Sequence, residues 1–254
     1  MAGPAFIVHG GAGSGRYPKT DPRFRELSAS VEVGLAAMRK GSSLDGVVAA
    51  VEHMEETGIF NAGRGACMTA MGKLQLDAAV MRGDTLRGAG VAVVESTYHP
   101  VTLARWVAEN TGAVLLAGRD TRAYARAAGL RDLKLIPAAA SRAKFRRLVS
   151  ELKPGEGNPG LWDRIRGGGT VGAVAVDRAG VPAAAGSPGG MWLKLPGRVG
   201  DSAVLGAGVF ADGHGAACAT GTGEAIIRSA TTFTACRLIS PQVEFPRPPG
   251  PSTR

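Results

Sequence analysis

The chain has 254 residues, of which 44% are hydrophobic and 5% aromatic, and it carries a formal net charge of +9. This length suits one large domain or two small ones, and the apolar content is enough for a sizeable core. No apolar run reaches the roughly 18 residues of a membrane-spanning helix, and the first residues do not have the pattern of a signal peptide. The three cysteines follow no regular spacing, which argues against a disulfide framework and favours a reduced, cytoplasmic setting.

The first half of the chain predicts helices and strands in groups. Residues 5–11 predict a strand that ends in a glycine turn. Asp21 is typical of a helix N-cap, Pro22 of the first helical position and Gly41 of the residue after a helix, and a second helix is expected from Ser43. A glycine at 72 between two strand-like runs predicts a hairpin. Further strands are expected at 90–95 and 113–118, and further helices at 99–110, 121–129 and about 140–153.

The second half predicts a linker, a series of strands and a tail. Residues 154–169 have the composition of a linker. Short strands with glycine turns are expected within residues 170–177, 181–186, 202–210 and 215–221. Residues 237–254 contain five prolines and show no periodicity, which predicts an irregular tail. Grouped helices with grouped, mostly hairpin-connected strands predict an α+β fold in layers.

Three glycines, at 167–169, stand directly before Thr170. A threonine hydroxyl is a weak nucleophile unless a base lies beside it. If the bond from Gly169 to Thr170 is cut, Thr170 gains an α-amine with a pKa near 8, so one residue supplies both nucleophile and base. The glycines allow backbone conformations that help the hydroxyl to attack its own preceding carbonyl. Taken alone, the stretch also fits a flexible linker that meets a strand.

Long motifs on both sides of Thr170 resemble the plant-type L-asparaginase / isoaspartyl peptidase family of N-terminal nucleophile hydrolases. They are IVHGGAG, IFNAGRGACMTAMGKLQLDAAVMRG, HPVTLAR, SPGGMWLKLPGRVGDS and ATGTGE. The resemblance covers about residues 5–230 and implies one domain, over 1–236, with a four-layer αββα sandwich. It implies a precursor that cuts itself into an α subunit, 1–169, and a β subunit, 170–254. It also implies homodimers of such αβ units that hydrolyse the side-chain amide of L-asparagine and β-aspartyl dipeptides.

The resemblance implies roles for individual residues. Thr170 matches the nucleophile, and the bond before it matches the cleavage site. Arg198 matches the anchor of the substrate α-carboxylate, which suits a guanidinium fork, and Asp201 matches the anchor of the α-ammonium group. Without the surrounding signature, Arg198 and Asp201 would be read as a surface ion pair.

Three further residues complete the implied site. Thr220 and Gly221 match the oxyanion hole, where a hydroxyl and a backbone N–H meet the negative charge of the reacting carbonyl. Asn61 matches a residue that orients the catalytic threonine, although a structural asparagine fits that turn as well. No cofactor is expected for catalysis. A structural sodium ion is implied at a loop whose candidate carbonyl ligands are those of Met54, Glu55, Thr57, Phe60, Ala62 and Arg64.

The sequence departs from the family pattern at two places. The family has a second threonine near the nucleophile at the position of Pro188, and proline offers no donor. Ser187 is a poor substitute, because neighbouring strand residues point to opposite faces. The likeness also fades after about Arg228. The sandwich is therefore expected to be incomplete at this end, or to be completed by another subunit or by a rearranged tail.

Other functions remain open from the sequence. A catalytically silent homologue that acts as a binding or assembly partner fits both departures, and a glycosylasparaginase-like amidase would share the nucleophile. The segment HGGAGSG lacks the lysine and the spacing of a phosphate loop, and His9 is expected to be a packed residue at a strand end. A basic group on one predicted helix lacks interleaved aromatic residues, so we expect a solvated face and no nucleic-acid partner; its members are Arg142, Lys144, Arg146 and Arg147.

Overall fold

The computed structural model describes residues 3–12, 17–18, 20–151 and 169–239. Its strands are β1 (Ala5–His9), β2 (Leu76–Arg82), β3 (Gly88–Val94), β4 (Leu115–Ala117), β5 (Thr170–Val176), β6 (Pro182–Pro188), β7 (Val209–Asp212) and β8 (Gly215–Cys218). Its α-helices are α1 (Pro22–Lys40), α2 (Ser43–Glu56), α3 (Pro100–Asn110), α4 (Thr121–Ala127), α5 (Ala139–Ser150), α7 (Gly223–Arg228) and α8 (Thr231–Ile239). Short 3₁₀ turns cover Gly63–Gly65 and Asp201–Ala203.

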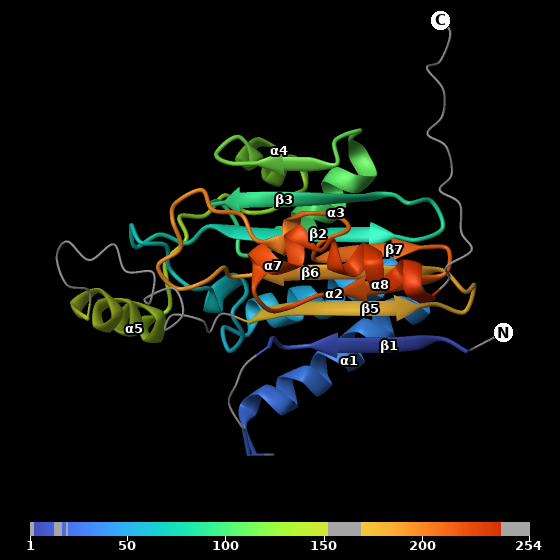
Figure 1. Cartoon of the computed structure of the whole chain (residues 1–254), viewed down its shortest axis with the longest axis horizontal. Helices are drawn as coiled ribbons and strands as arrows, with labels where there is room; N and C mark the ends of the chain where they lie inside the picture. The colour runs from blue at the N-terminus through green and yellow to red at the C-terminus, as the bar shows by residue number, and fades with distance from the viewer. Residues whose placement is uncertain (1–2, 13–16, 19, 152–168, 240–254) are drawn as a thin grey trace, which may run out of the picture.

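The strands form two sheets that pack face to face. A six-stranded sheet has the order β1-β5-β6-β2-β3-β4, and every pair in it is antiparallel except β3 with β4. The second sheet is the antiparallel pair β7-β8, which packs on β2, β5 and β6 (Figure 1).

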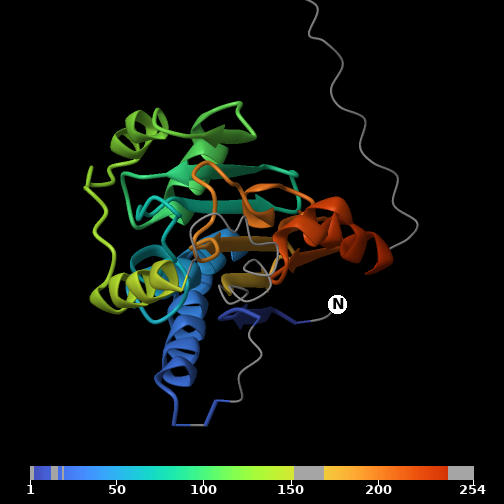
Figure 2. The ribbon, with the colours of Figure 1, turned by 60° about the vertical axis from the view of Figure 1, so that its left-hand side comes forward.

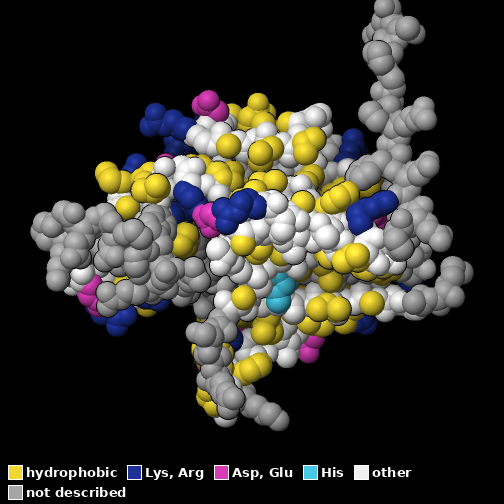
Figure 3. Space-filling view, in the orientation of Figure 1, with side chains coloured by type: hydrophobic (Ala, Val, Ile, Leu, Met, Phe, Trp, Pro, Cys, Tyr) yellow, Lys and Arg dark blue, Asp and Glu magenta, His cyan; other side chains and the backbone are white. Residues whose placement is uncertain are grey.

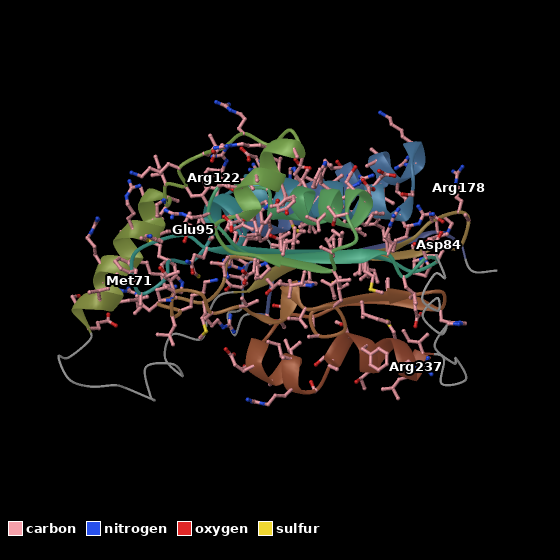
Figure 4. All side chains as sticks on the ribbon, turned by 90° about the horizontal axis from the view of Figure 1, so that it is seen from above. Met71, Asp84, Glu95, Arg122, Arg178 and Arg237 are labelled. Atoms are coloured by element: carbon pink, nitrogen blue, oxygen red, sulfur yellow. The ribbon has the colours of Figure 1, made fainter. Side chains whose placement is uncertain are left out.

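Helices cover the outer face of each sheet. Helices α1, α2 and α3 lie on the six-stranded sheet, and α8 lies on β7 and β8. Figures 2 and 4 show the two helical layers on opposite sides of the sheets. The order of layers is therefore α, β, β, α, and the predicted α+β layered fold is confirmed. In the part of the chain that is described, the second sheet has two strands.

The two sides of the large sheet take part in different cores. Val171 and Ala185 belong to the larger cluster, with residues of α2 and α3, whereas Val174 and Ala184 pack with β7. Because strand residues alternate between faces, Thr170 points toward the side of β7 and β8, and its neighbour Val171 points toward α2.

Local signals explain the helix boundaries that the sequence predicted. The side chain of Asp21 accepts a hydrogen bond from the backbone of Arg23 at the start of α1, and Pro22 follows in the first helical position. Ser42 and Asp45 form a reciprocal capping box at the start of α2. The predicted starts of both helices are confirmed, and Gly41 separates them as expected.

Several predicted elements are corrected by the structure. Gly72 does make a tight turn, but residues 61–70 form a loop rather than a strand, so the predicted hairpin is wrong. This loop is held by hydrogen bonds from outside it, including Ala70 N–H to the Lys194 carbonyl at 2.9 Å. The strand predicted from 202 begins only at Val209, after a 3₁₀ turn. Helix α8 extends to Ile239, so the first residues of the predicted tail are helical. Residues 240–254 and most of the predicted linker lie outside the described residues.

Candidate active site

Thr170 is the first residue of β5 and is 6% exposed. Its backbone N–H donates a hydrogen bond to the hydroxyl oxygen of Thr220 at 3.1 Å. The same hydroxyl oxygen accepts from the N–H of Ala12 at 3.2 Å. The fold therefore brings the predicted nucleophile and the predicted oxyanion-hole threonine into direct contact, although they are far apart in the sequence.

Asn61 binds the carbonyl group that precedes the predicted nucleophile. Its side-chain Nδ2 donates to the Gly169 carbonyl at 2.7 Å and to the Gly190 carbonyl at 2.6 Å. Its Oδ1 accepts from the backbone N–H of Cys67 at 2.8 Å. The amide thus uses both of its donors and an acceptor position, and one donor polarises the carbonyl of the predicted cleavage site.

Gly11 packs against the bond between Gly169 and Thr170. A Cβ atom on Gly11 would lie 2.7 Å from the Gly169 Cα and 3.3 Å from the Thr170 nitrogen, and Gly11 has a φ of +120°. Only glycine combines that conformation with such a close approach. Gly11, which belongs to the segment HGGAGSG, therefore gives the backbone room beside the predicted nucleophile.

Arg198 and Asp201 lie on one loop, and both side chains lie close to Gly223. A Cβ on Gly223 would lie 2.7 Å from Arg198 Nη2 and 3.0 Å from Asp201 Oδ1. Asp201 is 5% exposed, and its Oδ2 has no hydrogen-bond partner among the described residues. Burial raises the pKa of Asp201 above its usual value, and the nearby Arg198 opposes that rise. The loop thus places the guanidinium of Arg198 near the buried carboxylate of Asp201, whose Oδ2 can accept a hydrogen bond from a ligand.

Glu224 is a member of this site that the sequence motifs did not single out. Its Oε1 accepts from Arg198 Nε at 2.9 Å and from Nη2 at 2.8 Å. Its only signal in the sequence is its place at the end of the motif ATGTGE, three residues after Gly221 of the predicted oxyanion hole. The ion pair ties the segment of Thr220 and Gly221 to the loop of Arg198.

Comparisons with known proteins find related sequences over most of the chain. The asparaginase family matches residues 2–245. A plant-type L-asparaginase of Pyrobaculum calidifontis is 44% identical over 92% of this chain and 79% of its own. An isoaspartyl peptidase of Salmonella typhimurium is 39% identical over 92% and 78%, and an isoaspartyl peptidase/L-asparaginase of Danio rerio is 39% identical over 89% and 72%.

The chain belongs to the asparaginase family. Its departure from the family pattern at Pro188 lies inside the site, because Pro188 is the cross-strand partner of Thr170 and shares its face. Ser187 points to the opposite face, toward α2, and its hydroxyl has no hydrogen-bond partner among the described residues. The expectation that Ser187 cannot replace the hydroxyl missing at 188 agrees with this geometry.

Glu55 is buried completely at the end of α2, on the far side of the sheet from Thr170. Burial raises its pKa to about 6, opposed by the imidazole of His99, whose Nδ1 lies 3.6 Å from Glu55 Oε2. The Val101 N–H donates to Glu55 Oε1 at 3.2 Å. The side chain of Glu55 therefore joins α2 to the start of α3.

His9, the side chains that could bind a metal and the length of the helices complete the description of the molecule. His9 ends β1, and a Cβ on Gly172 would lie 2.4 Å from its Nε2, so the ring packs across the neighbouring strand. Burial lowers the pKa of His9. Among the described residues, no group of His, Cys, Asp and Glu side chains is arranged to hold a metal ion. No helix of the described residues is long and apolar enough to cross a membrane.

Proposed function

We propose that this chain is a self-processing threonine hydrolase that cleaves the side-chain amide of L-asparagine and β-aspartyl dipeptides. The observation that carries the proposal is the set of contacts at one peptide bond. Asn61 holds the Gly169 carbonyl, and Thr220 accepts from the Thr170 N–H that follows it. Relatives named plant-type L-asparaginase and isoaspartyl peptidase support the choice of substrate.

The first reaction is cleavage of the chain itself. The Thr170 hydroxyl oxygen attacks the Gly169 carbonyl carbon, and its proton passes to the Thr170 nitrogen as the C–N bond breaks. Asn61 Nδ2 already donates to that carbonyl oxygen and stabilises the charge that develops on it. Water then hydrolyses the ester, which leaves residues 1–169 as one subunit and residues 170–254 as the other. Thr170 now carries a free α-amine with a pKa near 8.

The second reaction uses that amine as the base. It takes the proton of the Thr170 hydroxyl, whose oxygen attacks the β-carbonyl carbon of the substrate. The Thr220 hydroxyl and the Gly221 N–H stabilise the oxyanion, and the proton passes to the leaving ammonia or amine. Water releases aspartate from the β-aspartyl ester. The active species is proposed to be a homodimer of αβ units in the cytoplasm.

Substrate recognition is proposed to depend on charge at Arg198 and Asp201. The α-carboxylate of the substrate binds the guanidinium of Arg198, which Glu224 already orients. The α-ammonium group binds Asp201, whose Oδ2 is buried without a partner among the described residues. Pairing with a cation lowers the pKa of a carboxyl group, so a bound ammonium keeps Asp201 ionised despite its burial.

We also propose a structural sodium ion, held by backbone carbonyl oxygens of the loop that follows α2, and the resemblance to the family is the support for it. Oxygen ligands of this kind suit hard cations. A higher melting temperature in sodium chloride than in choline chloride at equal ionic strength supports the ion. Equal melting temperatures would contradict it.

A silent homologue is the second candidate, and Pro188 is the observation that favours it. We expect no nucleic-acid partner. Lys and Arg occur in several separate groups on the face in Figure 3. Lys144 lies over the Trp192 ring at 4.8 Å, and Arg142 donates to the Pro137 carbonyl at 2.6 Å, so two of the basic side chains of α5 have local partners.

The decisive experiment is intact-mass measurement of the purified chain, followed by an assay of ammonia release from L-asparagine. We expect two fragments divided between Gly169 and Thr170, and ammonia release that rises with the fraction cut. Thr170→Ala is expected to abolish both. A chain that stays whole after long incubation and releases no ammonia indicates the silent homologue, whereas ammonia release by uncut Thr170→Ala protein would exclude the mechanism.

A further inference from the structure

Lys194 is a fully buried lysine, with no exposed surface, and Asp77 is buried to the same degree. Lys194 Nζ donates to the Gln75 carbonyl at 2.9 Å and lies 3.7 Å from Asp77 Oδ2. Burial lowers the pKa of Lys194, and Asp77 opposes that effect. A buried ion pair adds little stability over apolar residues of the same size, because both charges lose their water. We therefore considered which neighbouring segments the pair of Lys194 and Asp77 holds in position.

Asp77 connects its strand to two other segments. Its Oδ1 accepts from the Val93 N–H at 2.8 Å, and its Oδ2 accepts from the Gly200 N–H at 3.4 Å. The register of β2 against β3 shifts between Leu76 and Ala78, which is the position of Asp77 itself. Irregularities of this kind re-aim a side chain, often beside an active site. Val93 has a φ of +56°, which a β-branched residue rarely adopts.

The segment that Asp77 reaches is the one that carries the proposed substrate anchors. Besides the bond at Gly200, the Gly197 N–H donates to Gln75 Oε1 at 2.9 Å. Arg198 stands between these two glycines, and Asp201 follows the second. Gln75 and Asp77, at the start of β2, therefore fix the backbone on both sides of Arg198, and Lys194 fixes the segment at its beginning.

Lys194 and Arg198, the two cations of this segment, also repel each other. Arg198 contributes to lowering the pKa of Lys194, and Asp77 contributes to raising that of Asp201. Without Asp77, the positive charge of Lys194 would lie close to Arg198 in a region with little water, and the repulsion would move one of them. The carboxylate of Asp77 thus balances Lys194, so that the charge of Arg198 is left for Glu224 and a ligand.

We propose that Lys194 and Asp77 are positioning residues for recognition of the amino-acid end of the substrate. The buried pair sets the separation of Arg198 and Asp201, and hence the fit of an α-carboxylate beside an α-ammonium group. The inference rests on the proposed function of these two anchors. It concerns binding, because neither Lys194 nor Asp77 contacts Thr170, Thr220 or Asn61 by a described hydrogen bond.

The test uses the double variant Lys194→Met/Asp77→Asn, which removes both charges and keeps similar volumes. Lys194→Met alone would leave an unpaired buried carboxylate and is not informative. The exposed Lys73, two residues before Gln75, provides the control Lys73→Met. Binding of L-aspartate is measured by titration calorimetry, and kcat and KM are measured with L-asparagine. For the double variant we expect Kd and KM to rise about tenfold or more, with kcat changed less than about threefold, because misplaced anchors weaken binding first.

A second readout does not depend on activity. Hydrogen exchange of the Gly197 and Gly200 amides is expected to quicken in the double variant and in Asp77→Asn alone, because both replace the carboxylate that accepts from the Gly200 N–H. A folded double variant with unchanged Kd and protected Gly197 and Gly200 amides would overturn the inference. If the unmodified chain itself binds no L-aspartate, the proposed function fails, and faster exchange of these amides in Asp77→Asn would still establish the anchoring role.

Discussion

Replacing Asn61 tests whether the contacts at the cleavage site exist in solution. Asn61→Ala removes two donated hydrogen bonds, of 2.7 and 2.6 Å, and one accepted bond of 2.8 Å. Asn61→Asp keeps the shape and the acceptor, but it turns a carboxylate oxygen toward the carbonyl oxygens of Gly169 and Gly190. Both variants leave the rest of the loop unchanged.

The expected loss of stability follows from the three bonds. Each buried hydrogen bond contributes about 1 kcal/mol net, and each buried group left without a partner costs about 1–3 kcal/mol. Asn61→Ala should therefore lower the free energy of unfolding by about 3–5 kcal/mol, a large share of the roughly 5–15 kcal/mol of a typical domain. Asn61→Asp should lower the free energy of unfolding at least as much, because a carboxylate oxygen would face the carbonyl oxygens of Gly169 and Gly190.

The measurement is made on chains that are all uncut. Both substitutions are placed in a Thr170→Ala background, and unfolding is followed in guanidinium chloride. The control is Asn110→Ala, which removes one exposed hydrogen bond to the Trp106 carbonyl and should change stability by less than about 0.5 kcal/mol. A loss below about 1 kcal/mol for Asn61→Ala would refute the three hydrogen bonds of this side chain. With Thr170 present, Asn61→Ala should also slow self-cleavage by about 10²–10³, the usual effect of removing one donor from an oxyanion.

Three further substitutions test Pro188, Gly11 and Glu55. Pro188→Thr restores a hydroxyl on the face of Thr170 and should speed self-cleavage in intact-mass time courses; an unchanged rate would exclude the missing hydroxyl as the limiting factor. Gly11→Ala should slow or stop cleavage, since its Cβ would meet the Gly169 backbone at 2.7 Å, whereas Gly112→Ala, with nothing within 4 Å, should not. The folded-state pKa of Glu55 is about 6, above its unfolded value, so unfolding free energy should fall by about 2 kcal/mol as pH rises from 4.5 to 7.5. In Glu55→Gln this decrease in the free energy of unfolding should largely disappear. The measurement is thermal unfolding at several pH values, and a decrease that persists in Glu55→Gln would show that other groups cause it.

The sequence motifs indicated which distant residues lie together better than local patterns indicated the secondary structure around them. The motifs point to Thr170, Thr220, Asn61, Arg198 and Asp201, and the fold brings these residues to two adjoining places, at the start of β5 and at the loop after β6. The length of the motifs made this possible, because glycines and polar residues in a fixed order over many positions rarely match a family by chance. Periodicity alone would not have distinguished GGGT from a linker.

The errors have physical causes. The run around Gly72 looks like two strands, but its first half is held by Asn61 and by the loop after β6, which no local pattern reports. The pairs of Arg198 with Glu224 and of Lys194 with Asp77 join distant segments, and a lysine in the sequence gives no sign that it is buried. Helices α7 and α8 are short, with 6 and 9 residues, so they present little period to detect.

Pro188 bears on the chemistry of this protein more than on its architecture. It is the last residue of β6, and its pairing with Thr170 is the last in the register of β5 and β6, so the missing N–H leaves the inner ladder intact. The hydrogen bonds that Asn61 and Thr220 make here involve the Gly169 carbonyl and the Thr170 nitrogen rather than the Thr170 hydroxyl, the proposed nucleophile. The proposed anchors Arg198 and Asp201 lie on a different loop, which keeps its own hydrogen bonds to Glu224 and Asp77. A chain built in this way should bind L-aspartate as well before the Pro188→Thr change as after it, and only the rates of cleavage and turnover should respond. A change in Kd that equals the change in rate would show that proline also disturbs the binding loop.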